Sequence, residues 1–491
     1  MRFCFIPPLC AIGILSFLPQ TLGYSIHQPS RPQHWLELRD IEHNSTKSGE
    51  APPPSLIIDT FQDPLHNDLG FWHGPGEDLN IHHEPGLFRL FPIDPDQNFH
   101  TQFNNRGCYS LLPWQNQFLH VVFEGTDQFT VSLNEHNAEC SPDRAPFPGV
   151  PDSVQASRYV MRTRLDGSNG FQSSQDRSTL ASTQHDIKRR ALRDSCEDDE
   201  DENENENDDD DQSPASPTRN ELYIPLNHFK IDQRRVVSIS FNGFYTNETI
   251  TLRRIEIVPS VPPPAPANNY FGIPEKLPSG QLVLRCSVPN SFAFGIDDGQ
   301  PQFAQEVMKI LDEEDVRVTF FVVGAGLRDS TTNFTRFYRE MMDKGHQVAL
   351  HSNTHPKMEA LPTMEMIDDE IVRTLRVFKD RLSLTSRYFR PPFGTVGARM
   401  RQQLAKHIEH PFIVNWSVDV EDWLWANTST PEKQLDAFHR GVSRGGNLAV
   451  MHFLNPSTVQ YLRHFIRHVK SAGFKIMRID QCLADPFSPV L

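Results

Sequence analysis

The sequence predicts two folded regions of different class: an all-β sandwich, jelly roll-like, over residues 55–260, and an α/β distorted (β/α)7 barrel over residues 280–491. At 491 residues, the chain is long enough for two or three domains. From residue 55 its apolar runs are short and separated by Gly, Pro, Asn and Asp, which is typical of strands. After residue 280 such runs alternate with segments of helical periodicity, which indicates a parallel sheet covered by helices. The Pro-rich residues 261–279 predict a stiff linker.

Residues 1–23 have the composition of a secretory signal peptide, with one early Arg, an apolar centre and a small residue at the end. A signal anchor is the alternative interpretation. Residues 24–54 are polar and Pro-rich, and we expect a disordered leader. No later stretch is apolar for long enough to span a membrane, and the C-terminus lacks the hydrophobic tail of a GPI signal. We therefore expect a secreted protein, extracellular or associated with the cell wall.

A polar insertion interrupts the sandwich pattern between about residues 146 and 218. It ends in an acidic run, 197–211, which holds twelve acidic residues and no basic one and accounts for most of the net charge of −16. Such composition cannot bury enough apolar surface to order itself, so we expect the insertion to be disordered. The acidic run is either a solvated spacer or a site for a basic glycan such as deacetylated chitosan. The remainder is only mildly acidic, and nothing in it indicates nucleic-acid binding. The sandwich strands are expected in SLIIDTF, GLFRLFP, QFLHVVF and FTVSLN before the insertion, and in ELYIPLNHF, VVSISFNGF and TITLRRIEIVP after it.

Seven apolar runs predict the strands of the barrel, and six segments between them have helical periodicity. In such barrels the chemistry lies at the C-terminal ends of the strands. The clearest helical segments are 302–315, 334–345, 370–382 and 458–473. The expected strands are SFAFGI (291–296), RVTFFVV (317–323), HQVALH (346–351), RYFRPP (387–392), FIVNWSV (412–418), NLAVMH (447–452) and FKIMRI (474–479).

Ionisable residues at the ends of two of these strands predict a metal site. The first strand ends in Asp297 and Asp298, whose adjacent charges repel at the end of a buried strand, and the third leads into HSNTHP with His351 and His355. Alone, the carboxylates are typical of a solvated turn and the histidines of a packed or surface pair. Together, two imidazoles and one carboxylate form a three-ligand site with open positions, which suits zinc and is compatible with cobalt or nickel. We assign Asp298, His351 and His355 as ligands, so that the metal neutralises one carboxylate, lowers the pKa of bound water and polarises a substrate carbonyl.

Further residues at strand ends complete an acyl-hydrolase site. Asp297 is left free to act as the base, and Arg390 of RPPFG would hold it ionised. His452 would protonate the leaving nitrogen, with Asp422 of DVEDW holding it as imidazolium. Backbone N–H groups near Phe393 would help to stabilise the oxyanion. Alone, RPPFG is typical of a rigid turn and His452 of a packed histidine, but their placement on successive strand ends favours a site.

The motifs FGIDDGQ, HSNTHP, RPPFG, DVEDW and LAVMH resemble those of the polysaccharide deacetylase (NodB-homology) family of carbohydrate esterases over about residues 280–486. The resemblance implies the same roles for the base, the metal ligands, the Arg beside the base, and the catalytic His with its Asp. It also implies that Trp423 and Val450 flank a pocket for the acetyl methyl group. The chain departs from the family pattern at four positions beside these motifs: Gly295, Ile296, Gln300 and Phe453.

The wider context LRCSVPNSFAFGIDDG, together with DQCLADP, is similar to fungal chitin deacetylases. This resemblance implies a disulfide between Cys286 and Cys482. An oxidising compartment favours disulfides, but five cysteines remain after the signal peptide, so at least one is unpaired or shared. The pairing of Cys108, Cys140 and Cys196 is open, with Cys196 the candidate for the odd one.

The predicted sandwich resembles galactose-binding-like jelly rolls through its strand pattern, IIDTF and the ending IPLNHF…RRIEIVP. The resemblance implies glycan binding, with Trp72 as a stacking residue, and a packing domain without ligand is the alternative. N-glycosylation sequons in polar surroundings begin at Asn44, Asn247, Asn333 and Asn427. Asn415 lies in an apolar strand, and we expect it to be unmodified.

These observations favour a secreted, metal-dependent hydrolase that removes N-acetyl groups from N-acetylglucosamine polymers, with zinc as cofactor and chitin or its oligomers as substrate. An O-acetyl esterase acting on xylan or another acetylated glycan is one alternative, which amide and ester substrates would distinguish. A catalytically inactive glycan-binding wall protein is another, which metal content would distinguish.

Overall fold

The computed structural model describes six segments of the chain. The expected signal peptide, leader residues 24–52, the acidic run and linker residues 263–271 lie outside them, as do Asn44 and Cys196. The described segments are residues 53–105, 107–149, 151–163, 169–171, 219–262 and 272–488.

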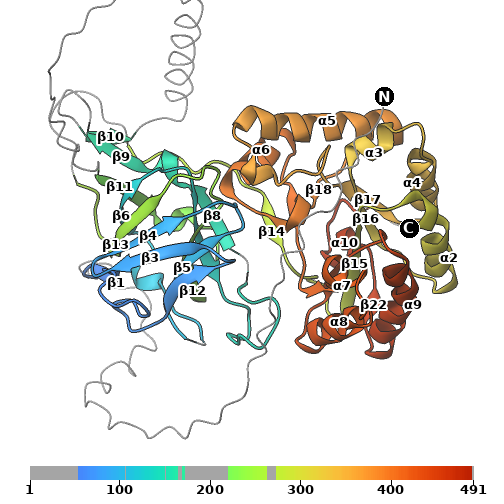
Figure 1. The fold of residues 1–491 in the computed structure, drawn as a ribbon, viewed down its shortest axis with the longest axis horizontal. Helices are drawn as coiled ribbons and strands as arrows, with labels where there is room; N and C mark the ends of the chain where they lie inside the picture. Colours follow the sequence, from blue (N-terminus) through green and yellow to red (C-terminus); the bar gives the residue numbers. More distant parts are fainter. Residues whose placement is uncertain are drawn as a thin grey trace, which may run out of the picture. The chain divides into compact units, whose positions relative to one another are not determined.

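The N-terminal region is β-rich and contains two antiparallel sheets (Figure 1). The larger has the order β10-β9-β11-β6-β13-β4-β3, with β1 paired to β13, and the smaller has the order β2-β5-β12-β7-β8. Short 3-10 turns lie at Leu112–Trp114, Ala156–Arg158 and Leu226–His228. The strands are β1 (Leu56–Asp59), β2 (His73–Gly76), β3 (Asn80–Glu84), β4 (Leu87–Phe91), β5 (Asn98–Gln102), β6 (Phe118–Gly125), β7 (Thr130–Glu135), β8 (Pro151–Gln155), β9 (Val160–Thr163), β10 (Asn169–Phe171), β11 (Arg219–Pro225), β12 (Val236–Asn242) and β13 (Ile250–Val258).

One apolar core is shared by these two sheets. Alternate residues of β6, such as Val121 and Phe123, and of β12, such as Ile239 and Phe241, belong to the same buried cluster. This alternation is what a strand with one face turned to a core requires. All seven strands expected in this region are present.

The start of the expected insertion at residue 146 is wrong. Residues 151–163 contain β8, which pairs with β7, and β9, which pairs with β11. The stretch reads as polar because β8 contains Asp152, but this carboxylate is buried between Lys276 and Arg401. A buried carboxylate is tolerated in a strand when cations pair with it, and the sequence pattern does not show such pairing.

The C-terminal region is a curled parallel sheet with the order β14-β19-β18-β17-β16-β15-β21-β20, and β22 pairs with β15. The seven expected strand segments all contain strands, and β14 was not expected. The sheet is not a closed barrel in its hydrogen bonding, since β14 and β20 end the order. The strands are β14 (Gln281–Val283), β15 (Ser291–Asp297), β16 (Thr319–Val322), β17 (Gln347–Leu350), β18 (Tyr388–Phe389), β19 (Phe412–Val414), β20 (Val418–Asp419), β21 (Leu448–His452) and β22 (Lys475–Ile476).

The expected strand FIVNWSV is divided because its backbone changes partner within the segment. The amide of Asn415 donates to the carbonyl of Val283 in β14, whereas the amide of Ser417 donates to the carbonyl of Leu448 in β21. β19 therefore lies next to β14 near one end of the strand order, and β20 forms the other end.

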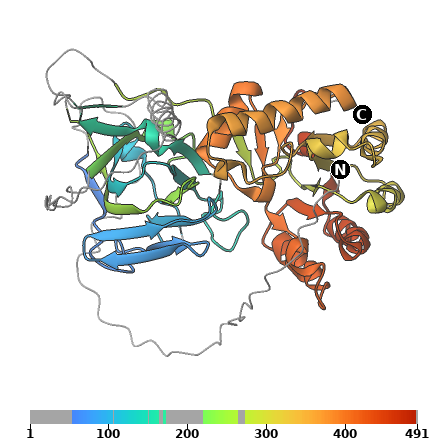
Figure 2. The same ribbon diagram turned by 45° about the horizontal axis from the view of Figure 1, so that its top comes forward.

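Helices lie around this sheet in both views (Figures 1 and 2). The four clearest helical segments are confirmed as α2, α4, α5 and α9. None of the helices in the described part of the chain has the length and apolar character of a membrane span. The helices are α2 (Ala304–Glu313), α3 (Gly324–Arg328), α4 (Phe334–Asp343), α5 (Met364–Leu382), α6 (Ala398–His407), α7 (Asp422–Trp425), α8 (Lys433–Ser443), α9 (Pro456–Ser471) and α10 (Ile479–Cys482), with 3-10 turns at Pro301–Phe303, Met358–Ala360 and Pro392–Gly394.

Two disulfides are present in the structure. Cys286, which follows β14, is bonded to Cys482 at the end of α10, as the resemblance to chitin deacetylases implied. Cys108 is bonded to Cys140, a pairing that the sequence left open.

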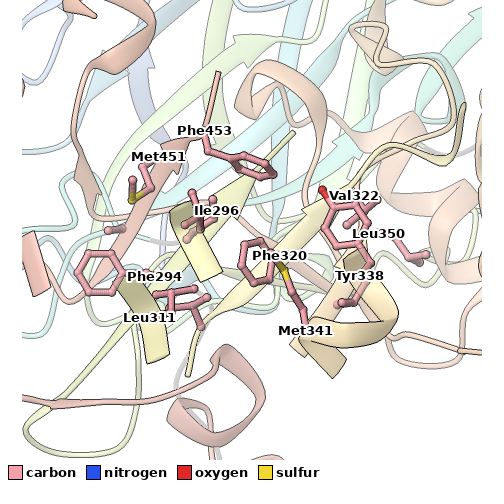
Figure 3. Packing of buried hydrophobic residues seen from close by; sticks show 14 of the residues in the cluster. Phe294, Ile296, Leu311, Phe320, Val322, Tyr338, Met341, Leu350, Met451 and Phe453 are labelled. Atoms are coloured by element: carbon pink, nitrogen blue, oxygen red, sulfur yellow. The ribbon is translucent and has the colours of Figure 1, made fainter. Parts of the chain in front are cut away.

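Two departures from the family pattern are core residues. Ile296 on β15 and Phe453 after β21 are fully buried in one apolar cluster with Phe320 of β16 (Figure 3). The Phe453 ring is also packed against Gly299, where any β-carbon would overlap it. Phe453 therefore has a packing role behind the strand ends.

Candidate active site and metal centre

The carboxyl ends of the parallel strands surround a cavity of about 450 Å³. Asp297 ends β15, His351 follows β17 and His452 ends β21, while Asp422 begins α7 just after β20. All the predicted catalytic, metal-binding and substrate-binding residues except Arg390 line this cavity, which places Arg390 behind it. The parallel register brings these distant motifs to one edge, as the strand order predicts.

Asp298, His351 and His355 form a three-ligand cluster. Their candidate ligand atoms all lie within 4.8 Å of one another. The Nε2 atom of His351 is 3.8 Å from Oδ1 of Asp298, and the Nε2 atom of His355 is 3.6 Å from Oδ2 of the same carboxylate. Two imidazoles and one carboxylate are the donors of a catalytic zinc site that keeps a position open.

The protonation state of His351 fits this role. Its Nδ1–H donates to the carbonyl oxygen of Arg390 at 2.7 Å, so Nε2 carries the free lone pair. That Nε2 atom is buried and has no hydrogen-bond partner. Burial lowers the pKa of His351 to about 3, against the opposing attraction of Asp298, so the ring is neutral at physiological pH. A buried, unpaired lone pair on a ring fixed through its other nitrogen is the arrangement of a metal ligand.

Arg390 holds Asp297 in place. The Arg390 guanidinium is fully buried and donates from Nη1 to Oδ1 of Asp297 at 2.7 Å. Its other nitrogens donate to the backbone carbonyls of Val414 and Asn415, which fixes the plane of the group. Burial raises the pKa of Asp297, and Arg390 opposes that rise. The other carboxylate oxygen, Oδ2, faces Nε2 of His351 at 3.9 Å.

The departure at Gly295 is explained by this arginine. A β-carbon at Gly295 would overlap the guanidinium of Arg390, which rests against the bare backbone of β15. A buried guanidinium with three hydrogen-bond partners in fixed positions cannot shift without losing hydrogen bonds. Gly295 therefore leaves the space in which the partner of Asp297 lies.

His452 and Asp422 form a second pair across the cavity. The Nδ1–H of His452 donates to Oδ1 of Asp422 at 2.8 Å, and the amide of His452 donates to Oδ2 at 2.7 Å. Burial would lower the pKa of His452, but the charge and hydrogen bond of Asp422, with Asp297 and Asp298, raise it to about 9. The ring is therefore held as an imidazolium that can supply a proton.

The backbone at this edge adopts conformations that the sequence does not indicate. Asp298, Ser352, His355 and Phe393 all have φ between 55° and 65°. Such left-handed conformations are unfavourable for residues other than glycine and are concentrated at functional sites. The conformation of His355 is supported locally, because its amide donates a hydrogen bond to Oγ of Ser352 at 2.9 Å.

Glu370 on α5 is a positioning residue that the sequence analysis missed. Its carboxylate accepts hydrogen bonds from the amides of Asn353 and Thr354, both at 2.8 Å, and from Oγ1 of Thr354 at 2.6 Å. It therefore fixes the loop that carries both histidine ligands. No motif signals it, since an acidic residue on an amphipathic helix is ordinary.

Asp419 is the second addition to the site. Nothing in the sequence assigned it a role, although it stands in the DVEDW motif. It lines the cavity beside Asp422, and burial raises its pKa to about 6. Its partly protonated carboxyl adds a further polar group beside the His452–Asp422 pair.

The apolar residues expected to bind substrate are at the cavity. Trp423 and Phe393 are 70% and 59% exposed, while Val450 is buried. The ring of Phe393 lies 4.8 Å from that of His355, between centroids. The amides of Gly394 and Thr395, which follow Phe393, donate within their own turn, so the expected oxyanion donor is neither of these.

Comparison with known proteins agrees with this geometry. Residues 286–409 match the family model for polysaccharide deacetylase. This match lies within the C-terminal region of the chain. A chitin deacetylase from Pestalotiopsis sp. is 26% identical over 43% of this chain and 69% of its own length, and one from Colletotrichum lindemuthianum is 27% identical over 43% and 86%.

A peptidoglycan-N-acetylglucosamine deacetylase from Listeria monocytogenes is 30% identical, and the match covers 40% of each chain. The solved chitin deacetylase from Colletotrichum lindemuthianum matches over 43% of this chain and 94% of its own, with 23% identity and a TM-score of 0.39. Each of these matches covers less than half of the chain.

Proposed function

We propose that the chain is a secreted, metal-dependent hydrolase that removes N-acetyl groups from N-acetylglucosamine polymers, with chitin or its oligomers as substrate. The observation that carries the proposal is the placement of two ion pairs, Asp297–Arg390 and His452–Asp422, around the Asp298–His351–His355 cluster. Relatives named chitin deacetylase and peptidoglycan-N-acetylglucosamine deacetylase support this substrate class. The two disulfides support secretion, because such bonds persist in oxidising compartments.

The proposed roles assign one proton transfer to each ion pair. Asp298, His351 and His355 would hold a divalent cation, zinc or cobalt, which would supply a Lewis acid for the acetyl carbonyl. Asp297 accepts the proton of the attacking water as a C–O bond forms, and Arg390 keeps this base ionised and oriented. His452 donates its proton to the nitrogen as the C–N bond breaks, so acetate and a free amine are released.

The apolar residues define the proposed acyl pocket. Val450 is buried at the cavity wall, and Trp423 projects from α7 at its rim. A methyl group fits between such residues, whereas a longer polar acyl group would leave its polar atoms without partners. Phe393, exposed beside His355, offers a face on which a sugar ring stacks.

For the β-rich region we propose a jelly roll-like sandwich of galactose-binding-like type. Its two antiparallel sheets share one apolar core, which supports that architecture. Trp72 is 37% exposed and is the proposed glycan contact. Loss of binding to insoluble chitin in Trp72→Ala, with unchanged hydrolysis of soluble oligomers, would support this role, and unchanged binding would leave the region with a packing role only.

Acetate release by the purified mature protein tests the main proposal. Chitooligosaccharides and acetylated xylan are compared with added zinc, with cobalt and after chelation. We expect release from the amide substrate that chelation stops and metal restores. Release from the ester alone would identify an esterase. No release from either, in a protein without bound metal, would indicate an inactive glycan-binding protein.

A further inference from the structure

Three histidines gather where α8 and α9 pack together, outside the site described above. His439 is on α8, and His464 and His468 stand one turn apart on α9. The Nε2 atoms of His439 and His464 are 3.1 Å apart. The rings of His439 and His468 have centroids 4.3 Å apart. His464 is exposed and the other two are half-buried, so the cluster is open to solvent.

We propose that His439, His464 and His468 bind a second transition-metal ion of the zinc class. In a tetrahedral site with Zn–N bonds of about 2.0–2.1 Å, neighbouring nitrogens are about 3.4 Å apart. The Nε2 atoms of His439 and His464 are already close to that separation. Neutral imidazole is a preferred ligand of zinc, nickel and copper ions.

The packing of α8 against α9 places the third proposed ligand, His468, beside the other two histidines. Residues four apart lie on one face of a helix, so His464 and His468 point to the same side of α9. His439 of α8 contacts both rings. In the structure only the nitrogens of His439 and His464 converge, while the His468 ring lies beside that of His439. His468 would have to rotate its side chain to bring a nitrogen to the same point.

One anionic side chain lies near the cluster. The carboxylate of Asp436, three residues before His439 on α8, attracts positive charge at that ring. A bound cation would therefore have a negative charge nearby. When the ion binds, the proton shared between the two Nε2 atoms moves to Nδ1 of the donor ring, which leaves both lone pairs free.

A metal ion held here would join α8 to α9. α8 contacts β20, which pairs with β21, the strand that ends in His452, and α9 contacts β22. Because ligands on two elements are bound only in the folded state, the ion would stabilise this part of the domain by mass action. The expected effect is on stability, and not on the chemical step.

Zinc stoichiometry of the untagged, full-length mature protein tests the proposal, measured by calorimetric titration and by metal analysis after gel filtration. We expect two zinc ions per wild-type chain and one in His439→Ala/His464→Ala, with acetate release unchanged. The wild type should also gain a few °C in melting temperature when the second ion binds, and the variant should not. A matched control, His66→Ala/His82→Ala, removes two exposed histidines elsewhere and should keep two ions.

His464→Gln serves as a second variant, since this exposed side chain can be replaced without loss of folding. It should weaken the second site at least tenfold. A wild-type stoichiometry of one, or two ions in the double variant, would overturn the proposal and leave the histidines as a hydrogen-bonded surface pair.

Discussion

Each side chain to which we assign a role in the proposed reaction has one buried partner. The guanidinium of Arg390 balances the charge of Asp297, and Asp422 stabilises the imidazolium form of His452. The backbone carbonyl of Arg390 accepts a hydrogen bond from Nδ1–H of His351 and so fixes the tautomer of that ring. The same arginine thus touches both the proposed base and one metal ligand. At this scale the site is a set of directed hydrogen bonds, and each bond assigns a protonation state.

Asp422→Asn tests the pairing of His452. In the proposed reaction His452 acts as an acid, so activity should be lost when pH rises above its pKa, which Asp422 and the other carboxylates raise to about 9 against the effect of burial. Removal of the Asp422 charge lowers that pKa, and the alkaline limb of kcat against pH should move down by about 1–3 units. The zinc content should stay the same. An alkaline limb that does not move would show that another group supplies the proton.

Sequence motifs identified most residues of the candidate site, but not the residues whose packing holds them in place. The paired carboxylates, HSNTHP and the strand-end histidine have residue types and spacing that already indicate metal and proton-transfer chemistry. Gly295 and Phe453 looked like departures, because their reasons are contacts with Arg390 and Gly299 that only the folded chain shows.

At the scale of elements, α5 fixes the ligand loop through Glu370. Glu370→Gln keeps the shape but replaces charged acceptors of three hydrogen bonds, so the loop should loosen. Affinity for the catalytic metal should fall by about 10-fold to 100-fold, as for other outer partners of metal ligands. The measurement is zinc binding in competition with a chelator.

Glu365→Gln is the matched control, since this exposed residue lies on the same helix. Its zinc affinity should equal that of the wild type. Equal affinities in both variants would contradict the positioning role of Glu370.

Strands and helices with strong periodicity were predictable, and irregular ones were not. The helices α2, α4, α5 and α9 each have an apolar stripe, and the buried strands have continuous apolar runs. β8 was missed because the buried charge of Asp152 resembles a loop residue. The division of β19 from β20 was missed because it depends on which neighbouring backbone each half meets.

At the scale of the whole molecule, the β-rich region and the C-terminal α/β region belong to one compact unit, residues 52–491. The contacts include an ion pair of 3.3 Å between Asp152 and Arg401, and a hydrogen bond from the amide of Ala398 to Oγ1 of Thr130. Composition predicted the two regions and their different classes. It could not predict these contacts, because single residues far apart in the sequence make them.

The disulfide Cys286–Cys482 closes the longest loop, with a sequence separation of 196 residues against 32 for Cys108–Cys140. In the chain-entropy model, this difference corresponds to about 1.6 kcal/mol at 25 °C. Cys286→Ala/Cys482→Ala should lower the free energy of unfolding by about 2–5 kcal/mol. Denaturant unfolding measures the loss, and Cys108→Ala/Cys140→Ala should cost less. A larger loss from the shorter loop would contradict this ranking.

The central claim is that Asp298, His351 and His355 bind the metal while Asp297 acts as the base. The most direct measurement is zinc content and acetate release from chitooligosaccharides for the wild type, Asp297→Asn and His355→Ala. Asp297→Asn should keep the wild-type zinc content and lose at least 100-fold in kcat, as expected for loss of a general base. His355→Ala should bind one zinc ion fewer and lose turnover. Substantial activity in Asp297→Asn, or wild-type zinc content in His355→Ala, would contradict the claim.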